Sequence, residues 1–112
     1  MAFRRGDVLL IPFPYSNLAA SKARPAIVLS GALYHASEPD LILLPTTTNL
    51  AAAVGPLDYI LRHWRQANLR YPSAVKPNPF TLDPNLVIHH IGALTATDLT
   101  AVERQLRAAL EL

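Results

Sequence analysis

One arginine and a run of threonines are the residues of this sequence best suited to chemistry on a phosphate. Arg24 stands between a polar loop and an apolar segment, and Thr46, Thr47 and Thr48 end the next apolar segment along the chain. A guanidinium held at the end of a strand can bind a phosphate through two parallel hydrogen bonds and stabilise a pentavalent transition state. Threonine hydroxyls can donate to the same phosphate. Because threonines also favour strands, the residue types alone favour a structural role.

A basic stretch from Arg62 to Lys76 is a second candidate for binding. It holds four cations and no acid, and a histidine, a tryptophan and a tyrosine stand among them. Cations neutralise phosphates and aromatic rings stack on bases, so this mixture suits a nucleic acid. A solvated loop around one buried tryptophan explains the composition more simply, and this stretch alone favours that interpretation.

Other kinds of site find little support. His89 and His90 are adjacent, so in a strand their side chains point to opposite faces and cannot chelate together. We expect neither a metal nor a cofactor. The glycines do not cluster into a phosphate-binding loop, and we interpret them as turn residues: Gly6, Gly31, Gly55 and Gly92.

The chain has 112 residues, of which 51% are hydrophobic, and no cysteine. This length predicts a single domain over residues 1–112 with a core of its own. The absence of cysteine favours a reducing compartment. Asp7, Pro12 and Pro14 interrupt the first apolar run, so it fits neither a signal peptide nor a membrane span. We therefore expect a soluble, cytoplasmic protein.

The pattern of the chain predicts a mainly β fold with a C-terminal α-helix. Two apolar runs, VLLI and LILL, lack any polar alternation, which indicates a sheet that is covered on both faces. Residues 86–91 fit either a strand or a helical turn. The expected strands cover residues 6–14, 25–33, 40–48, 57–61 and 73–76.

The last segment has the clearest signal. Thr95 followed three residues later by Asp98 is a capping pattern, and apolar residues then recur at helical spacing. This predicts a helix over residues 96–110. Several short strands followed by one terminal helix favour a small barrel or sandwich.

Four segments, in order along nearly the whole chain, resemble the PemK/MazF-like toxins of type II toxin–antitoxin systems. GDVLLIPFPYSNLAASKARPAIVLS is similar to the N-terminal signature of that family, and LILLPTTTNL to its third-strand motif. Residues 67–76, ANLRYPSAVK, are similar to its Gly-Leu-x-x-Pro-Ser-x-Val strand, although Asn68 stands in place of the glycine. Residues 91–94, IGAL, are similar to its Gly-x-Leu step before a terminal helix.

The resemblance implies a small SH3-like β-barrel that forms a homodimer and pairs with a cognate antitoxin protein. It implies a metal-independent, sequence-selective endoribonuclease that cuts single-stranded mRNA, an mRNA interferase. The RNA 2′-OH would be the nucleophile, and the product would be a 2′,3′-cyclic phosphate.

The resemblance also places the site. Arg24 would bind the scissile phosphate, stabilise its charge and take part in proton transfer, and Thr47 would hydrogen-bond the same phosphate. Ala19, Ala20 and Ala23 occupy the part of the first loop where some members of the family carry a carboxylate. The expected RNA contacts are Ser16, Asn17, Ser21, Lys22, Thr46, Thr48, Asn49, Arg65, Arg70 and Ser73.

Two alternatives remain open at this stage. The family has structural relatives that poison DNA gyrase by binding it and do not cut nucleic acid. A catalytically inactive RNA- or DNA-binding regulatory module is the other alternative. A gyrase poison has no need of both Arg24 and Thr47 at the ends of neighbouring strands, so this pair distinguishes the hypotheses.

Overall fold

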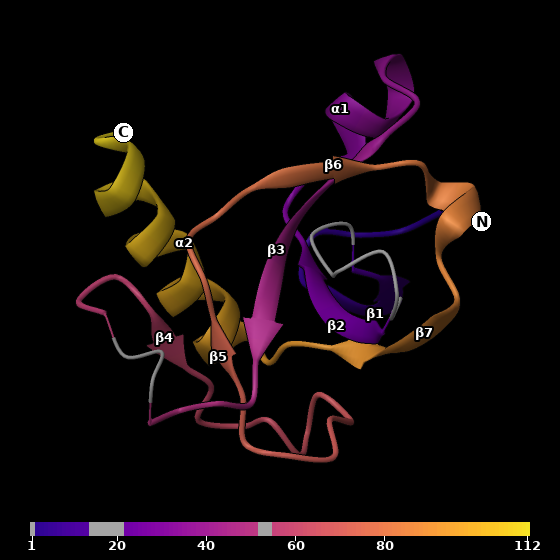
Figure 1. Cartoon of the computed structure of the whole chain (residues 1–112). Coiled ribbons are helices and arrows are strands. Elements are labelled where there is room, and N and C mark those ends of the chain that lie inside the picture. The colour runs from indigo at the N-terminus through magenta and orange to yellow at the C-terminus, as the bar shows by residue number, and fades with distance from the viewer. Residues whose placement is uncertain (1, 14–21, 52–54) are drawn as a thin grey trace.

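The computed structural model describes residues 2–13, 22–51 and 55–112. Within these residues, every strand pair is antiparallel and the strand order is β4-β5-β3-β2-β1-β7, with β6 also paired to β3 (Figure 1). None of the helices described is long and apolar enough to cross a membrane. The elements are β1 Asp7–Pro12, β2 Ala23–Val28, α1 Ala32–Ser37, β3 Leu41–Thr47, β4 Tyr59–Ile60, β5 Ala74–Val75, β6 Phe80–Leu82, the 3-10 turn η1 Pro84–Leu86, β7 His89–Ala93 and α2 Ala96–Leu110.

The predicted fold class, mainly β with a C-terminal helix, is confirmed, and α2 has the predicted bounds. Residues 86–91, which fitted a strand or a helical turn, contain the end of η1 and the start of β7. Two elements were missed. Helix α1 begins near the end of the expected strand 25–33 and continues beyond it. None of its residues is buried, so its sequence shows no periodic apolar pattern. Strand β6 lies in a segment rich in proline.

Strand β3 organises the sheet, because different parts of it pair with different neighbours. Its first half pairs with β6 on one side, its middle pairs with β2, and its last two residues, Thr46 and Thr47, pair with β5. In Figure 1, β6 crosses one end of β3 while β5 runs beside the other end. The C-terminal end of β3 therefore lies next to the start of β2, where Arg24 is located.

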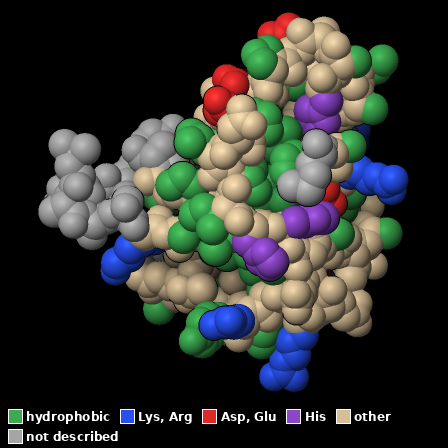
Figure 2. Space-filling view, turned by 90° about the vertical axis from the view of Figure 1, so that its right-hand side faces the viewer, with side chains coloured by type: hydrophobic (Ala, Val, Ile, Leu, Met, Phe, Trp, Pro, Cys, Tyr) green, Lys and Arg blue, Asp and Glu red, His purple; other side chains and the backbone are tan. Residues whose placement is uncertain are grey.

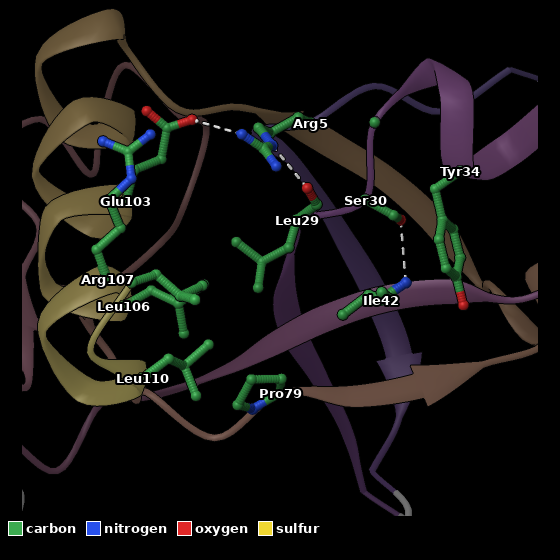
Figure 3. A pocket seen from close by; sticks show the side chains of 12 residues that line it. Arg5, Leu29, Ser30, Tyr34, Ile42, Pro79, Glu103, Leu106, Arg107 and Leu110 are labelled. Atoms are coloured by element: carbon green, nitrogen blue, oxygen red, sulfur yellow. Dashed lines mark hydrogen bonds and ion pairs between the residues drawn. The ribbon is translucent and has the colours of Figure 1, made fainter.

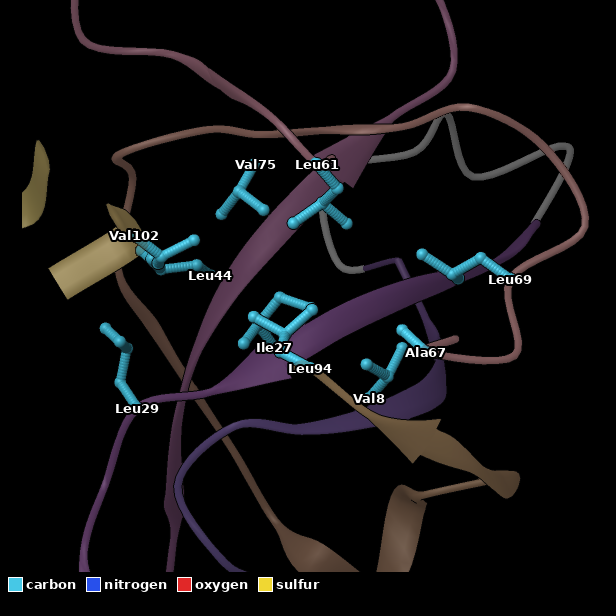
Figure 4. Packing of buried hydrophobic residues seen from close by; sticks show 10 residues of the cluster. All are labelled: Val8, Ile27, Leu29, Leu44, Leu61, Ala67, Leu69, Val75, Leu94 and Val102. Carbon is cyan, nitrogen blue, oxygen red and sulfur yellow. The ribbon is translucent and has the colours of Figure 1, made fainter. Parts of the chain in front are cut away.

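The sheet is covered on both faces, as the uninterrupted apolar runs predict. On the helix face, Val8, Ile27 and Leu44 pack with Val102 of α2 (Figure 4). On the opposite face, here called the β6 face, alternate residues of the same strands pack with residues of β6; the cluster includes Leu9, Ile11, Val28, Leu43, Phe80 and Leu82. Successive side chains of a strand point to opposite faces, so residue parity decides the face on which each candidate functional side chain lies.

Helix α2 is fastened to the sheet through Asp98, which is fully buried. As predicted, Thr95 caps the helix, because its Oγ1 accepts a hydrogen bond from the Asp98 N–H at 3.3 Å. The Asp98 carboxylate forms hydrogen bonds with a distant part of the chain. It accepts hydrogen bonds from the Tyr59 hydroxyl at 2.7 Å, the Arg62 N–H at 3.1 Å and the His63 N–H at 2.9 Å. One carboxylate therefore holds the 59–63 segment against the helix.

This contact makes stability depend on pH in the alkaline range. Burial, together with the hydrogen bond to Asp98 and the charge of that carboxylate, raises the pKa of Tyr59 from 10.0 to about 12. Above about pH 10 the unfolded chain loses this proton while the folded chain keeps it. The free energy of unfolding should therefore fall as pH rises from about 10 to about 12, and less steeply in Tyr59→Phe. Urea unfolding of both proteins across this pH range tests the prediction. An equally steep fall of the free energy of unfolding with pH in the wild type and in Tyr59→Phe would contradict it.

The turn at residues 67–68 packs directly against β7. A Cβ added to Gly92 would lie 2.4 Å from the Ala67 carbonyl oxygen, so Gly92 permits a close approach within a strand, and its interpretation as a turn residue is wrong. Asn68 has a φ of 68°, in the left-handed region that asparagine tolerates better than most residues. Its Nδ2 donates to the Ile91 carbonyl at 2.8 Å. Asparagine can therefore stand where the related motif has glycine.

Candidate functional site

Arg24 and Thr47 lie opposite each other at the ends of β2 and β3. The ladder pairs Ala26 with Pro45, and the same register continued by two residues sets Arg24 opposite Thr47. The two strands remain adjacent there, because the Thr46 hydroxyl donates to the Pro25 carbonyl at 2.8 Å. Residues opposite each other in a sheet project to the same face. Arg24 is exposed and Thr47 is half-buried, so both side chains can be reached from solvent.

Two further residues join this pair. The Arg24 guanidinium carbon lies 5.1 Å from the centre of the Phe13 ring, a cation–π contact that leaves the N–H groups at the edge of the guanidinium. The Phe13 N–H donates to the Lys22 carbonyl at 3.1 Å, which continues the β1–β2 register. Lys22 and Arg24 are two residues apart and so project to one face. Phe13 carries no predicted role, and its place directly before the first loop is the only signal in the sequence.

The hydroxyl of Thr47 is oriented by a local hydrogen bond. Its Oγ1 accepts from the Asn49 N–H at 3.1 Å. Because a hydroxyl has one donor as well as acceptor sites, the hydrogen of Thr47 remains able to donate to a ligand oxygen. Two cations and one oriented donor at exposed strand ends form a site suited to a phosphodiester, which we call the phosphate site: Lys22, Arg24 and Thr47.

The other predicted contact residues lie in different places. Thr46 is buried with its hydroxyl bonded to Pro25, and Ser73 is buried with its hydroxyl donating to the Tyr71 carbonyl at 2.9 Å. Thr48 and Asn49 are exposed beyond the end of β3. Ser16, Asn17 and Ser21 lie outside the described residues.

The cations of the basic stretch from Arg62 to Lys76 have different contacts. The Arg65 guanidinium stacks 4.8 Å from the centre of the Trp64 ring. Lys76 Nζ lies 2.7 Å from the carboxylate of Asp58. Burial alone would raise the pKa of Asp58, but hydrogen bonds from Lys76 and from the Gly55 N–H outweigh burial and lower it.

Arg70 lines a cavity of about 600 Å³ on the helix face, next to the strand ends that carry the phosphate site. Its floor is formed by half-buried residues of three strands, and residues of the 68–71 segment form one wall. We call it the strand-end cavity. Its lining includes Pro25, Thr48, Leu69, Arg70, Tyr71 and His89.

The adjacent histidines lie on opposite faces of β7, as expected. His89 lines the strand-end cavity, whereas His90 packs edge-on against the Phe3 ring and lies 3.6 Å from Asp7. Figure 2 shows histidine side chains among apolar ones on the face that includes β7, with lysine or arginine side chains at its lower margin. In the described part of the chain, no three His, Asp or Glu residues come together in a way that could hold a metal.

A second cavity, of about 440 Å³, lies between α1, β3 and α2, away from the phosphate site (Figure 3). Arg5 crosses its rim, donating to the Leu29 carbonyl at 2.6 Å and pairing with Glu103 at 3.0 Å. Leu106 and Leu110 are among the apolar residues that line the rest, and Ser30, Tyr34 and Arg107 line it too. None of the predicted site residues lines this cavity.

The fold and the phosphate site together define a small, bent antiparallel β protein that presents an arginine and a threonine at neighbouring strand ends. The family described as the PemK-like, MazF-like toxins of type II toxin–antitoxin systems matches residues 4–110. The chain belongs to this family, which confirms the resemblance seen in its sequence.

Solved structures show the same fold. An endoribonuclease in complex with its cognate antitoxin, from a mycobacterial species, is 20% identical and superposes with a TM-score of 0.80 over 99% of this chain and 97% of that one. MazF from Deinococcus radiodurans is 23% identical, with a TM-score of 0.76 over 100% and 99% of the two chains. The Mycobacterium tuberculosis toxin MazF-mt6 is 20% identical, with a TM-score of 0.72 over 95% and 97%. No curated protein matches the sequence significantly.

Proposed function

We propose that this toxin is a metal-independent, sequence-selective endoribonuclease that cuts single-stranded mRNA. The observation that carries the proposal is the placement of Arg24 opposite Thr47 at exposed strand ends, with Lys22 on the same face. The family membership and the endoribonucleases among its structural relatives support the same activity.

The reaction needs little covalent chemistry from the protein. The RNA 2′-oxygen attacks the adjacent phosphorus and loses its proton, while the bond to the 5′-oxygen breaks and that oxygen takes up a proton. The products are a 2′,3′-cyclic phosphate and a 5′-hydroxyl. Arg24 binds the phosphate and stabilises the charge that builds up on it. Thr47 donates a hydrogen bond to the same phosphate.

The first experiment uses the wild-type protein and a long single-stranded transcript in buffer with EDTA. We expect cleavage at a restricted set of sequences, with cyclic phosphate ends, and no cleavage where the nucleotide before the cut carries a 2′-deoxyribose. A requirement for added metal would exclude this mechanism. Absence of any cleavage would favour the alternatives, a gyrase-binding toxin or an inactive regulatory module.

Two variants of Thr47 separate the hydroxyl from the shape of the side chain. Thr47→Val removes the hydroxyl and should slow cleavage by about 10- to 100-fold, the range expected for one hydrogen bond to a charged group. Thr47→Ser keeps the hydroxyl and should retain most of the rate. Equal rates for the two variants would exclude the hydrogen bond from Thr47.

The proposal extends to partners and location. An mRNA substrate is consistent with action in the cytoplasm, and the family pairs its toxins with antitoxins. We expect a homodimer in solution, which light scattering coupled to gel filtration would detect. Coexpression of the cognate antitoxin should suppress growth arrest caused by the toxin.

A further inference from the structure

We infer that the strand-end cavity is a nucleobase pocket, which holds a base of the RNA whose phosphate lies on Arg24 and Thr47. The inference rests on the proposed function in one respect, the choice of RNA as the ligand. It adds a binding site and a role for residues that the phosphate chemistry does not use, Tyr71 and His89.

The strand-end cavity lies close to the phosphate site along the chain. The cavity is lined by Ala23 and Pro25, which flank Arg24, and by Thr48, which follows Thr47. Consecutive Cα atoms are about 3.8 Å apart, so the cavity begins within one residue of the phosphate site on two separate strands. Because adjacent side chains point to opposite faces, the phosphate site lies on the β6 face and the cavity on the helix face. A nucleotide chain that passes around the strand ends can reach both.

The floor and walls of the cavity are suited to a flat aromatic ring. Leu10, Pro25 and Ile91 form a floor of half-buried apolar surface, and Leu69 is buried in the wall. Tyr71 stands on the rim with 65% of its surface exposed. Single-stranded RNA is recognised by stacking unpaired bases on aromatic rings, and a tyrosine exposed to this extent is suited to that contact.

Exposed polar residues stand around the apolar floor of the cavity. Arg70, Thr48 and His89 are exposed residues that line the cavity. A binding pocket with mostly apolar walls and a few polar groups at its edge is typical of sites for small planar ligands, and about 600 Å³ falls within their usual size range. Arg70 is suited to a neighbouring phosphate, while Thr48 and His89 can hydrogen-bond the edge of a base.

The wall is held in place by the structure itself. Asn68 donates to the Ile91 carbonyl at 2.8 Å, Ala67 contacts β7 at Gly92, and the Leu69 N–H donates to the Trp64 carbonyl at 3.1 Å. The segment that carries Arg70 and Tyr71 is therefore tied to the sheet on one side and to the 64–67 turn on the other. A pocket that exists before binding can select one base over another.

The test measures binding to RNA that cannot be cut, so it does not depend on cleavage. The probes are a fluorescent pool of random-sequence single-stranded 2′-O-methyl RNA and an abasic strand of the same length and backbone. We expect Tyr71→Ala to weaken binding of the pool by about tenfold and to leave binding of the abasic strand unchanged. Tyr71→Phe keeps the ring and should bind the pool like the wild type.

Charge variants provide the matched control. Arg70→Glu should weaken binding of both probes and flatten the dependence of binding on salt, because it removes a phosphate contact. Arg107→Glu changes the same charge on the exposed side of α2, outside the cavity, and should bind both probes nearly as the wild type does.

The outcomes separate this inference from the proposed function. If the wild type cuts RNA but Tyr71→Ala binds the pool normally and cuts at the same sequences, the pocket is excluded and the nuclease stands. If the wild type cuts nothing, while Tyr71→Ala loses affinity for the pool alone, the pocket stands and the nuclease does not. Equal losses for the pool and the abasic strand would show that Tyr71 acts on the backbone, and would overturn the inference. So would a loss of dimerisation or antitoxin binding with RNA binding unchanged, because the cavity would then serve a protein.

Discussion

Replacing Arg24 by alanine is expected to slow RNA cleavage by about 100-fold or more while leaving the fold intact, because one charge-stabilising donor at a reacting centre contributes about that much. The side chain is exposed, so its removal should change the free energy of unfolding by less than about 0.5 kcal/mol. Initial rates on a single-stranded transcript in EDTA and a urea unfolding curve measure the two effects separately.

A lysine at this position distinguishes charge from geometry. Arg24→Lys keeps the positive charge and loses the planar fork that binds a phosphate through two hydrogen bonds, so it should recover only part of the rate. Arg107→Ala, a cation lost from the exposed side of α2, is the matched control and should cleave like the wild type. Full activity in Arg24→Ala would remove this residue from the mechanism.

Replacing Asp98 by alanine should give the largest loss of stability, about 3–5 kcal/mol. The change leaves the Tyr59 hydroxyl and the N–H groups of Arg62 and His63 without their acceptor, and each unsatisfied buried group costs about 1–3 kcal/mol. Such a loss is a large part of the stability of a small protein, about 5–15 kcal/mol in total. Urea unfolding with a common m-value measures it.

The matched control is another aspartate that caps a helical turn. Asp83 accepts a hydrogen bond from the Asn85 N–H at 2.9 Å but is exposed, so Asp83→Ala should cost about 1 kcal/mol. Equal losses for the two variants would show that the buried contacts of Asp98 to the 59–63 segment contribute no stability.

The parts of the fold that the sequence predicts well are those in which burial follows a regular period. Helix α2 presents Leu99, Val102 and Leu106 to the core at helical spacing, behind a capped first turn, and its bounds were predicted correctly. Strands β1 and β3 carry continuous apolar runs. Helix α1 packs no buried side chain, and β6 has three residues, so neither produces enough of a pattern to be recognised.

The candidate site was predictable only in part, for a similar reason. Arg24 and Thr47 were named together because the family resemblance places them at the ends of neighbouring strands, and the structure supplies the register that sets them opposite each other. The strand-end cavity could not be predicted from the sequence. Its wall depends on a turn at Asn68 and on the burial of Leu69, which are tertiary contacts with no local signal. The sequence indicated that Asp98 belongs to a capping motif. It did not indicate the three hydrogen bonds that Asp98 accepts from the 59–63 segment.

The contact between the 67–68 turn and β7 has a consequence for the protein in a crowded cell. Strand β7 lies at one end of the strand order, where an uncovered strand could pair with a strand of another molecule and start aggregation. The Asn68 amide occupies the Ile91 carbonyl, and the Ala67 backbone sits against Gly92. The 67–68 turn thus covers the middle of this sheet edge. Any side chain larger than the hydrogen of glycine at position 92 would displace the turn from β7.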